Sequence, residues 1–487
     1  MRKLIFLMFF SSAYAMAQQT HSDFQAYRDS IINEYKDFRK GLLDDYAKFL
    51  DGIWKEFEVF RGVKRNDTPK PTVVPQYKEL PDAPQPHLMP APEPQPAPRQ
   101  EPTAPTVTPP GPPRPLVLPK PDAAPALTFS FHGTKLKAPS IKAQTIAAHE
   151  GSALADAWRG YQESDYKAVI AALQNVATAL GLNDWFAVEL YRAYADALLP
   201  GGGRDERIAL QHFLLANAGF DVRVAYSKSE LLLLIAFRQK MYERQYLTID
   251  GTSYYIYQDN LSPAGEQIGS VYTCQLPADA DKGRAVDLTF HSAALSLTSG
   301  TDCTRTLTDG RLSVTCEVNT GMMELLRRYP QMDIPYYAAS QVLPPLHRSV
   351  LAQLKPQIEG LSQKDAANAL IHFVQYAFDY ATDGEQHGYE KAYFLEENFY
   401  YPKNDCEDRA IFFAFLVRHL LRLDVHLVQF PGHECTAVHF TDPAISGDAF
   451  MYKGTRFTIC DPTYIGASIG RCMPQYVQSQ PLVQEWY

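Results

Sequence analysis

The sequence lacks an excess of positive charge, and this absence narrows the range of partners. It contains 46 lysines and arginines against 55 aspartates and glutamates, a formal net charge of −9 at pH 7. A protein that binds the phosphate backbone of nucleic acid needs a basic surface, so we expect no nucleic-acid partner. With 46% hydrophobic residues in a chain of 487, there is enough apolar material for a large core and about three domains.

The sequence also lacks a late apolar run long enough to cross a bilayer. Its early run, Leu4–Phe10, is well short of the ~20 residues that a spanning helix needs. Arg2 and Lys3 precede this run, and Ala13–Ala17 has the A-x-A form of a cleavage site. Residues 1–17 are therefore expected to be a cleavable signal peptide, with an uncleaved membrane anchor as the alternative. We expect an exported protein, located in the periplasm, at the cell surface or secreted, with no transmembrane segment after cleavage.

An apolar repeat follows the expected signal peptide. Between Phe24 and Phe60, aromatic and aliphatic residues recur every eleven residues. Eleven residues fit three helical turns at ~3.67 residues per turn, which keeps the apolar side chains in one stripe. Residues 22–62 are thus predicted to form an amphipathic helix. Self-association through residues 24–60 is the first hypothesis for what covers the stripe, and packing on the globular part or on a membrane or cell-wall surface are the alternatives.

Residues 63–125 are rich in proline and almost without aromatic residues. Well over half of the 36 prolines of the chain lie here. Such a composition cannot bury a core and favours extended polyproline conformations, so this segment is predicted to be a linker.

The rest of the chain is predicted to be globular and of the α+β class. Helical periodicity dominates residues 126–265, and alternating apolar and polar residues make 266–335 strand-rich. Residues 336–487 have a helix-then-strand pattern and form the predicted catalytic domain.

Cys406 lies where a helix should begin, in "YPKNDCEDRAIFFAFLVRHLL". Asn404 or Asp405 is a natural N-cap, which puts Cys406 in the first turn of a buried helix. Free N–H groups and the helix dipole there stabilise a thiolate and supply half of an oxyanion hole. Glu407 and Asp408, like Asp405, oppose this because nearby carboxylates raise the pKa of a thiol. A cationic partner is therefore required for a reactive Cys406.

Two downstream segments supply partners for this thiol. His433 begins a predicted strand, and Asp461 ends a later one. A cysteine, a histidine and an aspartate in this order provide a nucleophile, a general base and an orienting carboxylate. His439 is the rival base, and a zinc site formed by His433, Cys435 and His439 is an alternative.

Disulfides remain open as well. Seven cysteines are an odd number, so in an exported protein at least one thiol stays outside any intramolecular pairing. Cys406 as half of a disulfide is an alternative to Cys406 as a nucleophile. Cys435 with Cys460, and Cys303 with Cys316 across a hairpin, are two further possible pairs.

The motifs "NDCEDRA", "GHECTAV" and "CDPTY" together resemble the transglutaminase-like fold of the papain-like cysteine peptidase superfamily, over roughly residues 350 to 470. The resemblance is to bacterial transglutaminase-like cysteine proteinases. It implies that Cys406 is the nucleophile, His433 the base and Asp461 the residue that orients His433, and it implies no cofactor or metal. Asn404 stands where the family has glycine, which concerns the substrate cleft more than the triad. Gln375 is a candidate second oxyanion donor, and a plain glutamine on the helix surface is the favoured alternative.

An earlier segment of the chain has a pattern similar to that of the predicted catalytic domain but lacks its cysteine, histidine and aspartate. Residues 209–237 align with 410–440 when Asp221 is matched to Asp424. In this alignment Glu230 falls at the position of His433, and Gln258 falls at that of Asp461. We therefore hypothesise that residues 126–265 contain a degenerate transglutaminase-like unit, with chance similarity between two amphipathic segments as the alternative.

These observations favour an exported thiol enzyme that hydrolyses peptide or amide bonds of a peptide or protein substrate through Cys406, His433, Asp461 and a thioester intermediate. A protein-crosslinking transamidase is one alternative. The other is a non-catalytic, envelope-associated binding or scaffold protein with the same fold.

Overall fold

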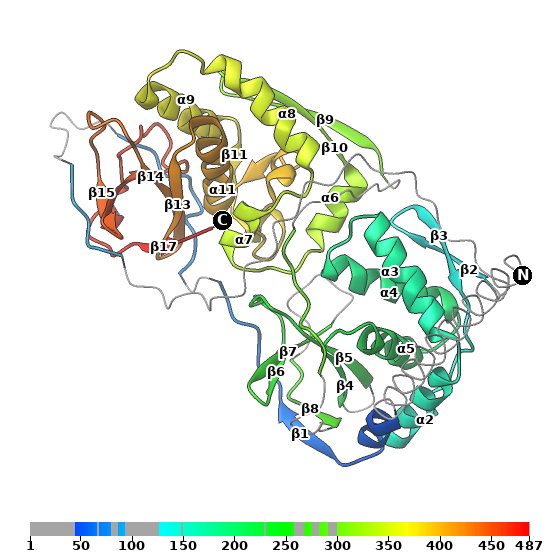
Figure 1. Cartoon of the computed structure of the whole chain (residues 1–487). Helices are drawn as coiled ribbons and strands as arrows, with labels where there is room; N and C mark the ends of the chain where they lie inside the picture. The colour runs from blue at the N-terminus through cyan, green and yellow to red at the C-terminus, as the bar shows by residue number, and fades with distance from the viewer. Residues whose placement is uncertain are drawn as a thin grey trace, which may run out of the picture.

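The computed structural model of this chain describes residues 44–65, 68–78, 86–92, 126–147, 150–227, 230–257, 267–274, 282–290 and 300–486 (Figure 1). The expected signal peptide, residues 22–43 of the expected amphipathic helix, and residues 66–67, 79–85 and 93–125 of the proline-rich segment lie outside these residues. The described part is mixed α and β, which confirms the α+β class. None of its helices combines the length and the apolar composition needed to cross a membrane.

The first globular unit opens with a hairpin and a layer of helices. These are β2 (Ala126–Phe131), β3 (Thr134–Pro139), α2 (Gly151–Gln162), α3 (Tyr166–Ala179), α4 (Asp184–Leu198) and α5 (Arg204–Asn217). The side chain of Asn183 caps α4 by accepting a hydrogen bond from the backbone N–H of Phe186. The ring of Phe213 in α5 contacts the rings of Trp158 and Tyr161, so α5 is the buried helix of this layer.

Helix α5 packs on the first sheet, whose strands are all antiparallel to their neighbours. In the part that the structure describes, the strand order is β1 (Trp54–Glu58), β8 (Ser270–Cys274), β4 (Val222–Ser227), β5 (Glu230–Ala236), β7 (Thr252–Ile256) and β6 (Tyr246–Ile249). Its strongly apolar central strands β4 and β5 are buried on both faces.

The expected helix over residues 22–62 is wrong at its C-terminal end. Trp54–Glu58 is strand β1, which pairs with β8 and so supplies backbone partners to an edge that would otherwise be open. Upstream, residues 44–50 are helical, with Leu50 buried and the ring of Tyr46 stacked on Trp158 at 4.3 Å between centroids. This described portion of the apolar stripe therefore packs on the globular part of its own chain, the alternative to self-association.

A mixed segment connects the two sheets. It contains the hairpin of β9 (Asp302–Thr308) and β10 (Ser313–Asn319), followed by α6 (Thr320–Arg327) and α7 (Ile334–Ala339). Asn319 begins α6 by accepting hydrogen bonds from the backbone of Gly321 and Met322. The strand-rich segment expected at 266–335 thus holds strands and a short helix.

The C-terminal unit is built around α11 (Cys406–Leu416), in which every residue is buried. Its other helices and short elements are α8 (Pro344–Leu354), α9 (Gln363–Tyr376), β11 (Asp379–Tyr380), α10 (Asp383–Gln386), β12 (Lys403–Asn404), the π-helical turn Val417–Leu421 and the 3₁₀ turns Lys355–Gln357, Leu395–Phe399 and Pro474–Tyr476. The sheet has the order β15 (Ala449–Tyr452), β16 (Thr455–Cys460), β14 (His433–His439), β13 (Asp424–Phe430) and β17 (Leu482–Gln484). Helix α11 packs on β14 and β13, with α7 and α9 as its further neighbours (Figure 1).

The two sheets share one strand order and one register. The series β8-β4-β5-β7-β6 corresponds to β17-β13-β14-β16-β15. Corresponding cross-strand pairs are Val222 with Ile235 and Val425 with Val438, Leu234 with Ile256 and Ala437 with Ile459, and Tyr246 with Tyr255 and Ala449 with Thr458. The last hairpin of each sheet turns through two residues of positive φ, Asp250-Gly251 and Lys453-Gly454, as a tight hairpin turn requires.

The described part of the proline-rich segment, residues 63–65, 68–78 and 86–92, is here named the strap. It runs along the C-terminal unit, so these residues are not the free linker that composition predicted (Figure 1). The backbone N–H of Tyr77 donates to the carbonyl of Ile465 at 2.8 Å, and that of Met89 donates to Ala449 at 2.7 Å on the edge strand β15. Neither Tyr77 nor Met89 is a proline, so each has a backbone N–H that can donate to the C-terminal unit.

All seven cysteines, each within the described residues, are free thiols. Cys303 and Cys316 do lie on the two strands of the β9–β10 hairpin, but Cys303 faces Val318 and Cys316 faces Arg305. The alternating register therefore keeps the two thiols from being cross-strand partners.

We expect a thiol assay on the purified, unfolded protein without reductant to find seven reactive thiols. A parallel sample treated with reductant and desalted is the control and should give the same number. Two thiols fewer in the untreated sample would contradict the free state of one pair.

Candidate active site around Cys406

Cys406 is the first residue of α11, held at the point where the chain turns from extended to helical. Asp405 before it is extended, with φ −120° and ψ −154°, and its N–H donates to the carboxylate of Asp408 at 3.4 Å. The thiol donates a hydrogen bond to the Glu407 carboxylate at 3.2 Å. The backbone N–H of Glu434 in turn donates to the sulfur. This contact joins the start of α11 to the residue that follows His433.

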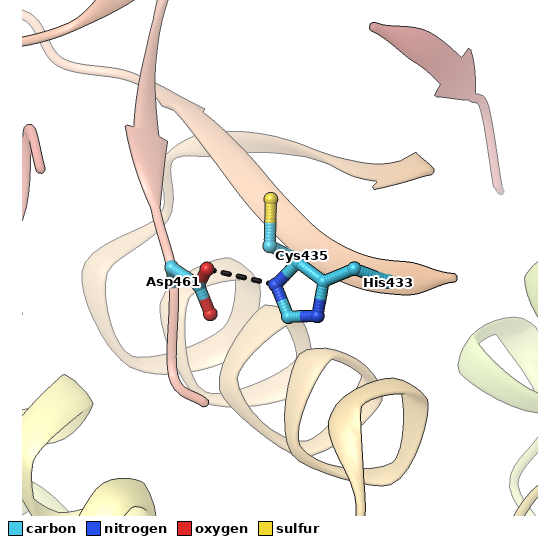
Figure 2. Close-up of side chains that lie close together, drawn as sticks. All are labelled: His433, Cys435 and Asp461. Carbon is cyan, nitrogen blue, oxygen red and sulfur yellow. Dashed lines mark hydrogen bonds and ion pairs between the residues drawn. The ribbon is translucent and has the colours of Figure 1, made fainter. Parts of the chain in front are cut away.

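His433 and Asp461 form a buried pair beside this point. Nε2 of His433 lies 2.8 Å from Oδ2 of Asp461, and the other oxygen of Asp461 accepts from the N–H groups of Thr463 and Tyr464 (Figure 2). Nδ1 of His433 is buried and has no hydrogen-bond partner among the described residues. The ring of Tyr476 stacks on the imidazole at 5.4 Å with an interplanar angle of 5°. The imidazole is thus fixed in orientation with one nitrogen still available.

The surroundings of the Cys406 thiol favour its protonated form. Burial raises the pKa of Cys406 well above its usual value, and the carboxylates of Glu407 and Asp405 raise it further. Cys406 is only 1% exposed. The cation that lowers this pKa is Lys70, which belongs to the strap. The Cys406 thiol is thus hydrogen-bonded to Glu407. In the described part of the chain, no hydrogen bond joins this thiol to His433.

Lys70 enters a pocket of buried carboxylates, here named the lysine pocket: Asp383, Asp405, Glu407 and Glu390. Its Nζ lies 2.8 Å from Asp383, 2.8 Å from Asp405, 2.5 Å from Glu407 and 2.9 Å from Glu390. The side chains of the first three are no more than 3% exposed, whereas Glu390 is 36% exposed and lies at the mouth. Burial alone would lower the pKa of Lys70, but the carboxylates raise it well above its usual value, so the ammonium is charged.

The lysine pocket carboxylates differ in protonation. Burial raises the pKa of Asp383 to about 7, and burial with neighbouring carboxylates raises that of Asp405 well above its usual range. Burial acts on Glu407 in the same sense, yet Lys70 and other donors outweigh it and lower its pKa. Glu407 therefore carries the charge that pairs with Lys70. Arg65, also in the strap, lies 3.6 Å from the same carboxylate.

Gln375 and His439 are not placed for the chemistry that we considered for them. The Gln375 amide donates to the carbonyls of Asp461, Tyr464 and Ala467 and accepts from Gly466, so its hydrogen-bonding capacity is used in holding the loop after β16. This buried role corrects the expectation of a second oxyanion donor. His439, at the far end of β14 from His433, is half-buried and bonds to the carbonyl of Arg456.

Four groups of described side chains have a spacing that suits a metal ion, and three of them include carboxylates of the lysine pocket. Ligand atoms of His433, Cys435 and Asp461 lie within 4.8 Å of one another, without the His439 of the zinc alternative (Figure 2). Those of Asp383, Asp405 and Asp408 do the same, but the ammonium of Lys70 contacts two of these carboxylates. In the first group, His433 and Asp461 already form a hydrogen bond with each other.

Sequence reasoning missed Lys70, Asp383 and Tyr476. Lys70 lies in the tripeptide Pro69-Lys70-Pro71, but the same tripeptide recurs around Lys120, so the motif alone could not identify it. Asp383 and Tyr476 lie in turns with no local pattern that points to a site. Only the fold brings them to Cys406 and His433.

No protein-family model matches this chain, and no curated protein or solved structure matches it either. Any functional conclusion therefore rests on the geometry of the site and on the motif resemblance.

The protonation of Asp383 predicts a pH dependence of stability. Folding raises the pKa of Asp383 from 3.8 to about 7. The contribution of this carboxyl group to the free energy of unfolding is therefore fully present below pH ~4 and is lost as the pH rises towards 7. We expect Asp383→Asn to gain stability relative to the wild type over this window, by at most about 1.4 kcal/mol per pH unit. Urea unfolding at several pH values measures this, and the exposed Asp379→Asn is the control. Parallel pH profiles for Asp383→Asn and the wild type would contradict the assignment.

Proposed function

We propose that this chain is a thiol enzyme of the transglutaminase-like type that hydrolyses peptide or amide bonds. The observation that carries the proposal is the buried His433–Asp461 pair. Nδ1 of His433 has no partner among the described residues. The next residue, Glu434, donates its backbone N–H to the sulfur of Cys406, which brings His433 close to the thiol. A nucleophile at a helix start, a base at a strand start and a fixed carboxylate are the parts that such catalysis needs.

The chemistry follows from these positions. His433 removes the thiol proton through Nδ1, and the Cys406 thiolate attacks the substrate carbonyl carbon. The free N–H groups of the first turn of α11 face the charge that develops on the carbonyl oxygen. The C–N bond breaks, the amine leaves with the proton from His433, and a thioester remains. Water, deprotonated by His433, attacks the thioester and releases a carboxylic acid and the thiol.

Hydrolysis is the better supported outcome of the thioester because water is always present, whereas crosslinking needs a channel for an acceptor amine. A non-catalytic binding protein is the second candidate. The buried thiol bonded to Glu407, with its raised pKa, favours it, because this arrangement is not reactive without a change.

We further infer that the first unit is a second copy of the fold that has lost its chemistry. The shared strand order and register support this. Gly203, the N-cap of α5, corresponds in the alignment to Cys406, the first residue of α11. Glu230, at the position of His433, is exposed and paired with Arg204. Gln258, matched to Asp461, lies outside the described residues.

The triad is tested by substitution in an assay with a mixture of peptides in ¹⁸O-labelled water, read by mass spectrometry. Cys406→Ala and His433→Ala should each lower product formation by about 10³-fold or more, and Asp461→Asn should lower it strongly because the imidazole loses its orientation. Incorporation of ¹⁸O into a new carboxylate identifies hydrolysis.

His439→Ala is the matched control, since His439 lies on β14 at the far end from His433, and this variant should keep most of the activity. Activity that survives Cys406→Ala would reject the thiol mechanism. An inert wild type, whose Cys406 reacts with iodoacetamide no faster than in His433→Ala at any pH, would favour the binding protein.

A further inference from the structure

The strap crosses the candidate active site as an extended peptide would. Pro69 lies against the β13–β14 turn so closely that a Cβ at Gly432 would be 2.7 Å from the Pro69 carbonyl oxygen. Gly432 immediately precedes His433. Further along, Tyr77 donates to Ile465, and Ile465 donates to Pro75, as in a parallel strand pair. Backbone pairing of an extended segment with an exposed edge is a general mode of peptide recognition.

The side chain of Lys70 is the part of the strap that enters the protein. The side chain is 8% exposed, although the flanking Thr68 and Pro69 are exposed. Its ammonium reaches all four members of the lysine pocket. Tyr380 fixes the backbone beside it by donating to the Pro71 carbonyl at 2.6 Å. A single extended segment therefore presents one cationic side chain to one buried acidic pocket.

Two buried carboxyl oxygens in and beside the pocket are not satisfied by Lys70. Oδ1 of Asp405, a pocket member, and Oε1 of the nearby Glu434 have no hydrogen-bond partner within the described ranges. Glu407 and Asp405 also hinder catalysis, because these carboxylates raise the pKa of the Cys406 thiol. Activation of Cys406 thus does not explain why they are there. Recognition of a cation does, since a buried anionic cluster is stable only when a counter-charge fills it.

We propose that the lysine pocket binds a lysine side chain of an extended peptide or protein substrate, and that Lys70 occupies it in this structure as a competitor within the chain. This inference rests on the proposed function and names its substrate class. It places a lysine side chain of the substrate beside Cys406 and the adjoining substrate backbone along the path of residues 68–77. Substrate binding then requires that the strap leave.

Binding without turnover tests the pocket separately from catalysis. The probe is a fluorescently labelled peptide with the sequence of residues 68–77, TPKPTVVPQY, and its analogue with norleucine in place of lysine. The protein is the full chain with Cys406→Ala. With Lys70→Ala added, we expect the lysine peptide to bind at least about 30-fold more tightly than the norleucine peptide. With Lys70 retained, the lysine peptide should bind more weakly, and Glu407→Gln should remove the preference for lysine.

Equal affinity for the two peptides, or no binding of either to a folded Lys70→Ala protein, would overturn the proposal. Asp379→Asn, which changes an exposed carboxylate near the pocket, is the control and should keep the preference. If binding shows the preference but the wild type hydrolyses nothing, the pocket stands and the hydrolase proposal fails. If the wild type hydrolyses peptides but shows no preference for lysine, the hydrolase proposal stands and the lysine pocket proposal fails.

Lys70→Ala leaves buried carboxylates without their cation and can fail to fold, so a second pair of variants keeps Lys70. Tyr77→Pro removes the N–H that binds Ile465, whereas Tyr77→Ala keeps this N–H and removes the same ring. We expect the lysine peptide to bind more tightly to the proline variant than to the alanine variant, because the strap is released. Equal binding of the two would count against competition by the strap.

Discussion

The charge of Lys70 is the interaction on which the candidate site depends. Asp383, Asp405 and Glu407 are buried within reach of the Lys70 ammonium, and a cluster of buried carboxylates is strongly unfavourable unless a cation neutralises it. The protein meets this requirement in two ways. Lys70 pairs with the ionised Glu407, and burial keeps protons on Asp405 and, below pH ~7, on Asp383. The state of Cys406 follows, because its hydrogen bond goes to Glu407.

The scaffold explains how such a site can exist in a stable fold. Helix α11 is buried throughout, and its N-terminus meets the β13–β14 turn at the contact between Glu434 and Cys406. The first unit has the same order of helix and strands, with α5 on β4 and β5, and it places Gly203 and Glu230 at the corresponding points. The sheet and its helix are therefore compatible both with a site that holds buried charges and with an end that lacks these residue types. What differs is a small set of side chains at one end.

Local patterns predicted the elements that carry the three residues of the proposed triad. The helix start at Cys406, the strand that begins at His433 and the turn after Asp461 have short-range signals, and the structure has α11, β14 and the end of β16 at those places. The strand β1 and the strap were missed because both depend on partners far along the chain. Nothing near Trp54 indicates that β8 has an open edge, and nothing near Lys70 indicates the pocket. Gln375 was misassigned because its helix position does not reveal the loop that it holds.

Proline content suits the strap to the role of a ligand within its own chain. Proline restricts the unbound backbone to extended conformations, so little conformational entropy is lost on docking. Attachment to the same chain gives such a ligand an effective concentration that is on the order of millimolar for a short flexible connection. The pairing at Tyr77 and Met89 raises the local concentration of Lys70 further. A free peptide with one lysine competes poorly against this, whereas a protein that contacts the edge of β15 and the lysine pocket together displaces both anchors. If the lysine pocket binds a substrate as proposed, its geometry favours extended, multiply anchored substrates over short ones.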